Sequence, residues 1–267
     1  MHGARPLLIH AFGSSDPLAL LSQCQQIQYL RGYLADLGAI SVLEEQNYFD
    51  RDYLSEFSSF YSISTSGYPN VCRRLHFFSG PELLRTELED AVSGSEQASS
   101  KLQSRYLGFI VLRPIPHAPL GRTVLKWYTD LTPKTPRVVD PSRTYWCNVA
   151  GLKLKVIGLA WQQQDTGVGA CATIGVWTMM HSSAFDDSHA IPTTAEITRS
   201  AHERASLGGR MFPSSGLTLY QIAEAIKALN LSPVIVEGNL SIPGQDNPAF
   251  DKARFCATDV TPVLAAV

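Results

Sequence analysis

An apolar strand and an apolar helix meet near residue 171 of this 267-residue chain, and their junction restricts the folds open to it. Residues 152–160 are apolar enough for a buried strand, while Ala172 and Val176 recur at helical spacing. A turn of small residues, 167–170, separates the two patterns and places Cys171 at the first turn of the helix. The pattern predicts a mixed fold in which this helix packs in a core and its N-terminus carries a thiol.

Helical and extended patterns alternate along the rest of the chain, which predicts an α+β fold. Helices are expected within residues 17–37, 50–61, 81–92, 193–204 and 217–229, and strands within 39–43, 73–78, 106–112, 123–128, 144–149 and 233–237. The Ser- and Gly-rich residues 93–101 are typical of a loop, and the proline-bearing residues 132–141 indicate a change of domain. We therefore expect an N-terminal α/β region of residues 1–140 and a second segment of residues 141–267.

Composition excludes several classes of protein. Lys and Arg total 22 against 24 Asp and Glu, so the formal charge of −2 gives no field that would attract nucleic acid. No run approaches the roughly 18 apolar residues of a membrane span, so no membrane association is expected. The five cysteines are scattered and never in C-x-x-C spacing, which predicts reduced thiols in a cytoplasmic protein and neither disulfides nor a metal site.

Cys171 combines three features that acyl transfer needs. Unpaired N–H groups and aligned peptide dipoles at a helix N-terminus favour the reactive thiolate over the thiol. The preceding glycines remove bulk, so that a substrate carbonyl can approach the sulfur. Upstream, Gln164 can point its amide N–H at the developing oxyanion, beside the backbone N–H of Cys171. A nucleophile and an oxyanion hole are therefore predicted within this short segment.

The segment resembles the papain-like cysteine peptidases, including the bacteriocin-processing peptidases of bacteria. The resemblance consists of a glutamine, small residues and a nucleophile that opens the central helix, here Gln164, Gly169, Ala170, Cys171, Ala172 and Trp177. It covers about residues 155–240 and implies a papain-like segment that cleaves a peptide or amide bond of a peptide or protein substrate without a cofactor. Residues 1–140 match nothing in the peptidase core, and a protein partner could bind through them.

A general base is missing from this picture. His181 follows Cys171 by ten residues on the same expected helix, about 15 Å away. His189 and His202 fall where helices and loops, rather than a returning strand, are expected. The apolar residues 260–267 are typical of a helix start without a C-cap. We therefore expect a portion of a longer chain, whose later strand carries the base histidine, and little or no activity without that strand.

Two other interpretations of these residues stay open. Gly167, Val168 and Gly169 fit the G-x-G-x-x-A fingerprint of dinucleotide-binding proteins, although a polar segment separates them from the strand. Alternatively, the papain-like segment is a binding or regulatory module that has kept its thiol and lost its base.

The remaining cysteines and the upstream histidines are interpreted as structural. Four thiols lie within expected elements and should be small buried side chains without polar companions, namely Cys24, Cys72, Cys147 and Cys256. Three histidines precede the nucleophile and should fill structural or surface roles, namely His10, His76 and His117. Burial of the Cys171 sulfur would assign that residue to the same structural class.

Overall fold

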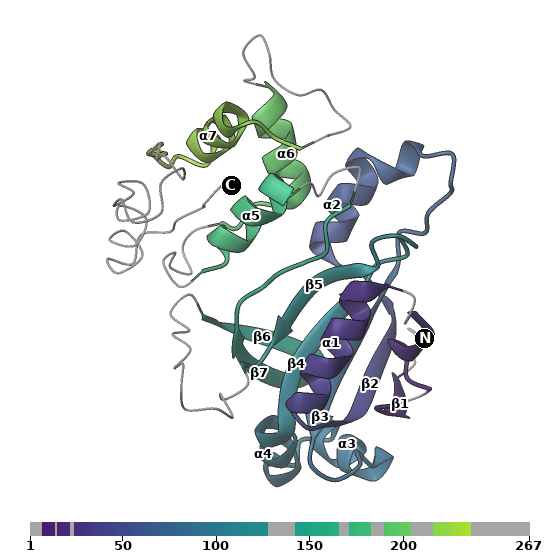
Figure 1. Ribbon diagram of the computed structural model, residues 1–267. Helices are drawn as coiled ribbons and strands as arrows, with labels where there is room; N and C mark the ends of the chain where they lie inside the picture. Colours follow the sequence, from purple (N-terminus) through teal and green to yellow (C-terminus); the bar gives the residue numbers. More distant parts are fainter. Residues whose placement is uncertain are drawn as a thin grey trace, which may run out of the picture. The chain divides into compact units, whose positions relative to one another are not determined.

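The computed structural model describes residues 7–13, 15–21, 24–127, 142–165, 171–182, 190–203 and 216–235. The chain forms two compact units (Figure 1). The first contains Met1–Leu54 and Ser64–Gln162, and the second contains Ser55–Ile63 and Gln163–Val267. Helices occur together with antiparallel sheets, so the expected α+β class is confirmed. No helix in the described ranges has the length and apolar character needed to cross a membrane.

The first unit is built on a five-stranded antiparallel sheet in the order β1-β2-β3-β4-β5. Its strands are β1 Leu7–Ala11, β2 Ala39–Tyr48, β3 Cys72–Ser79, β4 Tyr106–Leu112 and β5 Leu120–Leu125. Every residue of β4 is buried, because both faces of this strand are covered. The continuous apolar run that predicted a buried strand at residues 106–112 is thus confirmed.

Helix α1, Gln25–Asp36, lies across this sheet (Figure 1). Its apolar stripe of Ile27, Leu30 and Leu34 is buried against side chains of the sheet. Gly38 follows the helix with φ of +74°, a backbone conformation that costs glycine little. The helix and its glycine stop were both expected, although the preceding Ala19–Leu21 forms a separate short 3-10 helix, η1.

A second, two-stranded sheet consists of β6, Arg143–Val149, and β7, Leu152–Gly158. Ala150 and Gly151 connect them with φ of +48° and +93°, the two positive values of a tight hairpin turn. Alternate residues of β7 are buried, and the strand packs against β4 and β5. The hairpin therefore belongs to the first unit, and the division between units falls after Gln162, whereas the sequence analysis placed it after residue 140.

Two short helices between β3 and β4 differ from the sequence prediction. The expected helix at residues 81–92 begins only at Arg85 (α3, Arg85–Val92), because the Leu83 N–H donates to Ser41 Oγ at 2.8 Å and holds extended backbone there. The loop prediction for residues 93–101 is wrong, since α4 spans Glu96–Arg105. The Ser95 side chain caps α4 by accepting from the Ala98 N–H at 3.3 Å, so a serine that indicated a loop starts a helix.

The described part of the second unit is helical. It contains the end of α2 (Arg51–Ser59), the 3-10 helix η2 (Tyr61–Ile63), α5 (Cys171–Met180), α6 (Thr194–Glu203) and α7 (Leu219–Ala228). Helix α5 packs against α6 and α7, and Thr173 of α5 lies 3.3 Å from Thr198 of α6 between their hydroxyl oxygens. The strand expected at residues 233–237 is absent from its described part, 233–235, which is irregular.

Capping side chains define where α6 and α7 begin. The Glu196 carboxylate accepts from the Thr193 N–H at 2.7 Å, and the Glu196 N–H donates back to Thr193 Oγ1 at 3.2 Å. Thr218 and Gln221 form the same reciprocal pair ahead of α7. The capping pattern predicted for α6 from its sequence is thereby confirmed.

Candidate functional site

Cys171 is the first residue of α5, and its side chain is exposed. The helix behind it is apolar on every face, and it buries Val176, Trp177 and Met180 almost completely. Burial of these side chains fixes the helix axis, so the N-terminal thiol is held at the surface by a rigid element. The predicted helix start is confirmed, and Cys171 is not a buried structural cysteine.

The Cys171 sulfur is hydrogen-bonded to Gln164. The thiol donates to Gln164 Oε1 over 2.8 Å. Of the three consecutive glutamines, Gln162 and Gln163 are buried, and Gln164 is exposed beside the thiol. With the amide oxygen on the sulfur, the amide nitrogen of Gln164 remains a donor for a group that approaches the thiol. The structure therefore brings together the two residues predicted for acyl transfer.

The histidines considered as bases are placed differently. His181 is buried at the other end of α5, with its ring 4.2 Å from the Trp177 ring between centroids. His202 Nδ1 lies 2.7 Å from the Thr198 carbonyl oxygen of its own helix. Neither is hydrogen-bonded to the Cys171 sulfur in the described part of the chain. His189 lies outside the described residues, as do residues 166–170, which include the dinucleotide fingerprint, and residues 260–267.

Sequence reasoning missed a second cysteine cluster, which lies inside the first unit. Cys147 Sγ of β6 lies 3.7 Å from His76 Nδ1 of β3, and the Tyr106 hydroxyl donates to the same sulfur over 3.6 Å. His76 Nε2 lies 3.0 Å from Glu45 Oε2, to which Arg74 Nε also donates at 2.5 Å. The expectation that Cys147 lacks polar companions is therefore wrong.

Charge in this cluster shifts the pKa values of Cys147 and His76 in opposite directions. Burial acts to raise the pKa of the Cys147 thiol, but the charge and hydrogen bond of His76 and the charge of Arg74 outweigh it and lower that pKa. Burial acts to lower the pKa of His76, but Cys147 and the hydrogen bond to Glu45 raise it above its ordinary value. The shifts are those of a Cys–His–Glu catalytic triad.

Burial argues against catalysis at Cys147. Its side chain is 2% exposed, and the rings of His76 and Tyr106 are fully buried, so a substrate cannot reach the sulfur. The cluster instead joins the two sheets of the first unit, because Cys147 belongs to β6 and its partners to β2, β3 and β4. Arg74 adds a second tie by donating to the Asn148 carbonyl oxygen at 2.5 Å. A histidine beside Leu75, Phe77 and Phe78 in the strand 72–79 was a signal for buried polar structure, but its partner could come only from the register of the strands.

No group of three or more His, Cys, Asp or Glu side chains able to hold a metal ion occurs among the residues that the structure describes. Comparison with protein-family models finds no match, and comparisons with curated proteins and with solved structures find none either.

Proposed function

We propose that this chain is a papain-like thiol hydrolase of peptide or amide bonds, with Cys171 as its nucleophile and Gln164 in its oxyanion hole. The observation that carries the proposal is the 2.8 Å hydrogen bond between an exposed thiol, at the N-terminus of a buried helix, and a glutamine amide. Exposure lets a substrate reach the sulfur, and the N-terminus of the helix places backbone N–H groups close to it.

In the proposed reaction the Cys171 thiolate attacks the carbonyl carbon, and a carbon–sulfur bond forms while the carbonyl oxygen becomes an oxyanion. The Gln164 amide and the Cys171 backbone N–H donate to this oxyanion. Collapse breaks the carbon–nitrogen bond, the amine leaves with a proton from a general acid, and a thioester remains. The group that gave its proton to the amine then takes one from water, which attacks the thioester, and the carboxylate and the thiolate are released while the remaining proton passes to solvent.

The proton transfers need a group other than Gln164, because a neutral amide oxygen accepts a hydrogen bond but does not take the proton. The sequence identifies no general base for these transfers, and His189 lies outside the described residues. A thiol that stays protonated against Gln164 would favour the alternative function, a papain-like binding or regulatory module that has lost its base. An activated ester tests attack by the sulfur separately from proton transfer to the leaving group, because p-nitrophenolate leaves without being protonated.

The test is acylation by p-nitrophenyl acetate at neutral pH, followed by the absorbance of p-nitrophenolate and by peptide mapping of the thioester. Cys24 is the control, because its thiol also donates to a glutamine, Gln26 Oε1, at 3.1 Å, but Cys24 is partly buried and Gln26 lies within helix α1, whereas Gln164 precedes helix α5. We expect acylation at Cys171 and its loss in Cys171→Ser, with Cys24→Ser unchanged. Equal acylation of Cys24 and Cys171 would contradict an oxyanion hole at Gln164.

Hydrolysis of denatured casein by the same protein then distinguishes the enzyme from the binding module. The enzyme releases peptides, and Cys171→Ser abolishes their release. A protein that is acylated at Cys171 but leaves casein intact would have the nucleophile without a base, as the module requires.

A further inference from the structure

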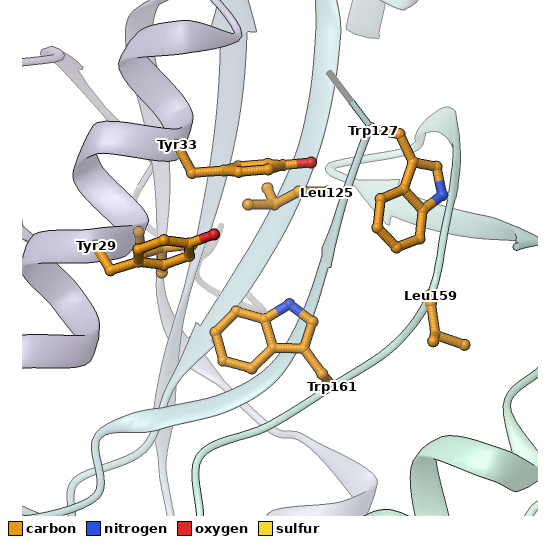
Figure 2. Close-up of a pocket in the computed structure, with 7 residues that line it drawn as sticks. Tyr29, Tyr33, Leu125, Trp127, Leu159 and Trp161 are labelled. Atoms are coloured by element: carbon orange, nitrogen blue, oxygen red, sulfur yellow. The ribbon is translucent and has the colours of Figure 1, made fainter. Parts of the chain in front are cut away.

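A pocket of about 190 Å³ opens in the first unit, and its lining residues include none from the Cys147 cluster and neither Cys171 nor Gln164. Four of its seven lining residues are aromatic. The lining consists of Tyr29, Leu30, Tyr33, Leu125, Trp127, Leu159 and Trp161. Figure 2 shows the four rings on different sides of one common space, two from α1 and two from segments that follow β5 and β7. The pocket is therefore a cage of aromatic rings.

Two of the rings are held in place by the fold. The Tyr33 hydroxyl donates to the Lys126 carbonyl oxygen at 2.6 Å, which ties α1 to the end of β5. The backbone of Trp161 pairs with Thr123 of β5, with N–H to oxygen distances of 2.8 and 3.1 Å. Leu30 and Leu125, 2% and 6% exposed, also line the pocket. The cage is thus largely formed before any ligand binds.

The other two rings lie at the mouth. Tyr29 is 74% exposed and Trp127 is 42% exposed, although both are large side chains that folding usually covers. A ligand that entered between them would remove aromatic surface from water on two sides. The mouth therefore has the exposed rings that a bound ligand would cover.

The lining selects the chemistry of the ligand. No Lys, Arg, Asp or Glu belongs to the lining among the described residues, so nothing there forms an ion pair. The faces of aromatic rings are electronegative and attract a cation. A primary ammonium carries three N–H donors that need acceptors, whereas the polar side-chain atoms of this lining are two phenol oxygens and two indole N–H groups, and an indole N–H only donates. A quaternary ammonium has no N–H group and loses no hydrogen bond on entry.

We infer that this pocket binds a trimethylammonium group through the rings of Tyr29, Tyr33, Trp127 and Trp161. The group could belong to a small compound such as choline or to a trimethylated lysine side chain. Both present the same cation of the same size to the cage, and the experiment distinguishes them by affinity.

The test titrates the full chain with choline, with Nα-acetyl-trimethyllysine amide and with unmethylated Nα-acetyl-lysine amide, followed by calorimetry. The decisive comparison is 3,3-dimethylbutan-1-ol, which has the shape of choline with carbon in place of the charged nitrogen. We expect choline or the trimethyllysine compound to bind at least about tenfold tighter than its uncharged or unmethylated counterpart. Whichever of choline and the trimethyllysine compound binds with higher affinity shows whether the group belongs to a small compound or to a modified lysine side chain.

Variants check that the cage is the binding site. Trp161→Leu should weaken binding at least about tenfold, and Trp127→Leu, which alters a more exposed ring, should weaken it as well. Trp146→Leu is the matched control, because Trp146 of β6 is 58% exposed and does not line the pocket. Equal affinity for choline and 3,3-dimethylbutan-1-ol, the absence of binding by any cation, or equal loss in Trp146→Leu would each overturn the inference.

Discussion

The direction of the hydrogen bond between Cys171 and Gln164 matters for the proposed chemistry. The thiol donates to Oε1 of the amide, so the amide dipole presents its nitrogen to a second group. Removal of the amide leaves the thiol at the helix N-terminus but deprives an oxyanion of one donor. A substitution of Gln164 can therefore distinguish the nucleophilicity of the Cys171 sulfur from stabilisation of the proposed oxyanion.

We expect Gln164→Ala to slow acylation of Cys171 by p-nitrophenyl acetate by about 10²- to 10³-fold, the usual effect of losing one oxyanion donor. Alkylation of Cys171 by iodoacetamide forms no oxyanion, so its rate should change little. Both rates can be measured by peptide mapping after brief reaction. A parallel fall in both rates would mean that Gln164 acts on the thiol itself and not on the oxyanion.

The hydroxyl of Tyr106 is fully buried between His76 Nδ1, at 3.0 Å, and Cys147 Sγ, at 3.6 Å. We expect Tyr106→Phe to lower the free energy of unfolding by about 1–3 kcal/mol, because it removes the buried hydrogen bonds of this hydroxyl with His76 and Cys147. Tyr220→Phe, at a ring that is 71% exposed, should change it by less than about 0.5 kcal/mol. Urea denaturation of both variants measures the difference.

Glu45 makes the free energy of unfolding of the first unit depend on pH in the acid range. Burial acts to raise the pKa of Glu45, but the hydrogen bond and charge of His76 and the charge of Arg74 outweigh it and hold that pKa below its ordinary 4.5. A depressed carboxyl pKa stabilises the fold above the unfolded value, and that stability is lost as the pH falls through the folded value. As the pH falls below about 4.5, wild type should therefore lose stability more steeply than Glu45→Gln. Parallel slopes in urea denaturation would contradict this assignment.

At the scale of elements, the β6–β7 hairpin is stabilised by side chains rather than by its turn. Its connecting Ala150 has φ of +48°, a conformation that is costly for a residue with a Cβ atom. The buried alternate residues of β7 and the Cys147 cluster compensate for this cost. The turn is therefore a site at which the protein can be made more stable.

We expect Ala150→Gly to raise the free energy of unfolding by up to about 1 kcal/mol, because glycine adopts positive φ without the Cβ penalty. Ala98→Gly makes the same chemical change at a helical position in α4 and should lower the free energy of unfolding by about 0.5–1 kcal/mol. Thermal denaturation of the two variants should shift the midpoints in opposite directions.

At the scale of the whole molecule, the two compact units carry different chemistry. The first contains the sheets, the Cys147 cluster and the aromatic pocket, and the second contains Cys171 and Gln164. Each unit has its own set of buried side chains. Damage to the core of one unit should therefore leave the local geometry of the other intact.

We expect Leu154→Ala, at a fully buried position of β7, to lower the free energy of unfolding of the first unit by about 2–5 kcal/mol. The alkylation rate of Cys171 in the native variant should stay within about twofold of wild type, because Cys171 lies in the other unit. Iodoacetamide labelling well below the melting temperature measures this rate. A large increase would show that the two units unfold together.

Local patterns in the sequence determined most of the elements. Periodicity located α1, β4 and α5, the capping pairs located α6, and the strand–turn–helix junction located Cys171 at a helix start, with Gln164 nearby. These features depend on neighbours within a few residues, so a single sequence contains them. Errors occurred where local signals competed, as at Ser95, where a residue common in loops is also a good helix cap.

Long-range pairing decided the rest. Cys147 meets His76 across 71 residues of sequence, and Tyr33 of the aromatic pocket contacts Lys126 across 93. Such contacts depend on strand register and on which face of a sheet a helix covers, and neither is encoded in the local periodicity of either segment. For that reason the sequence alone identified the exposed thiol and its glutamine, whereas the buried Cys–His–Glu cluster and the cage of rings emerged only from the folded chain.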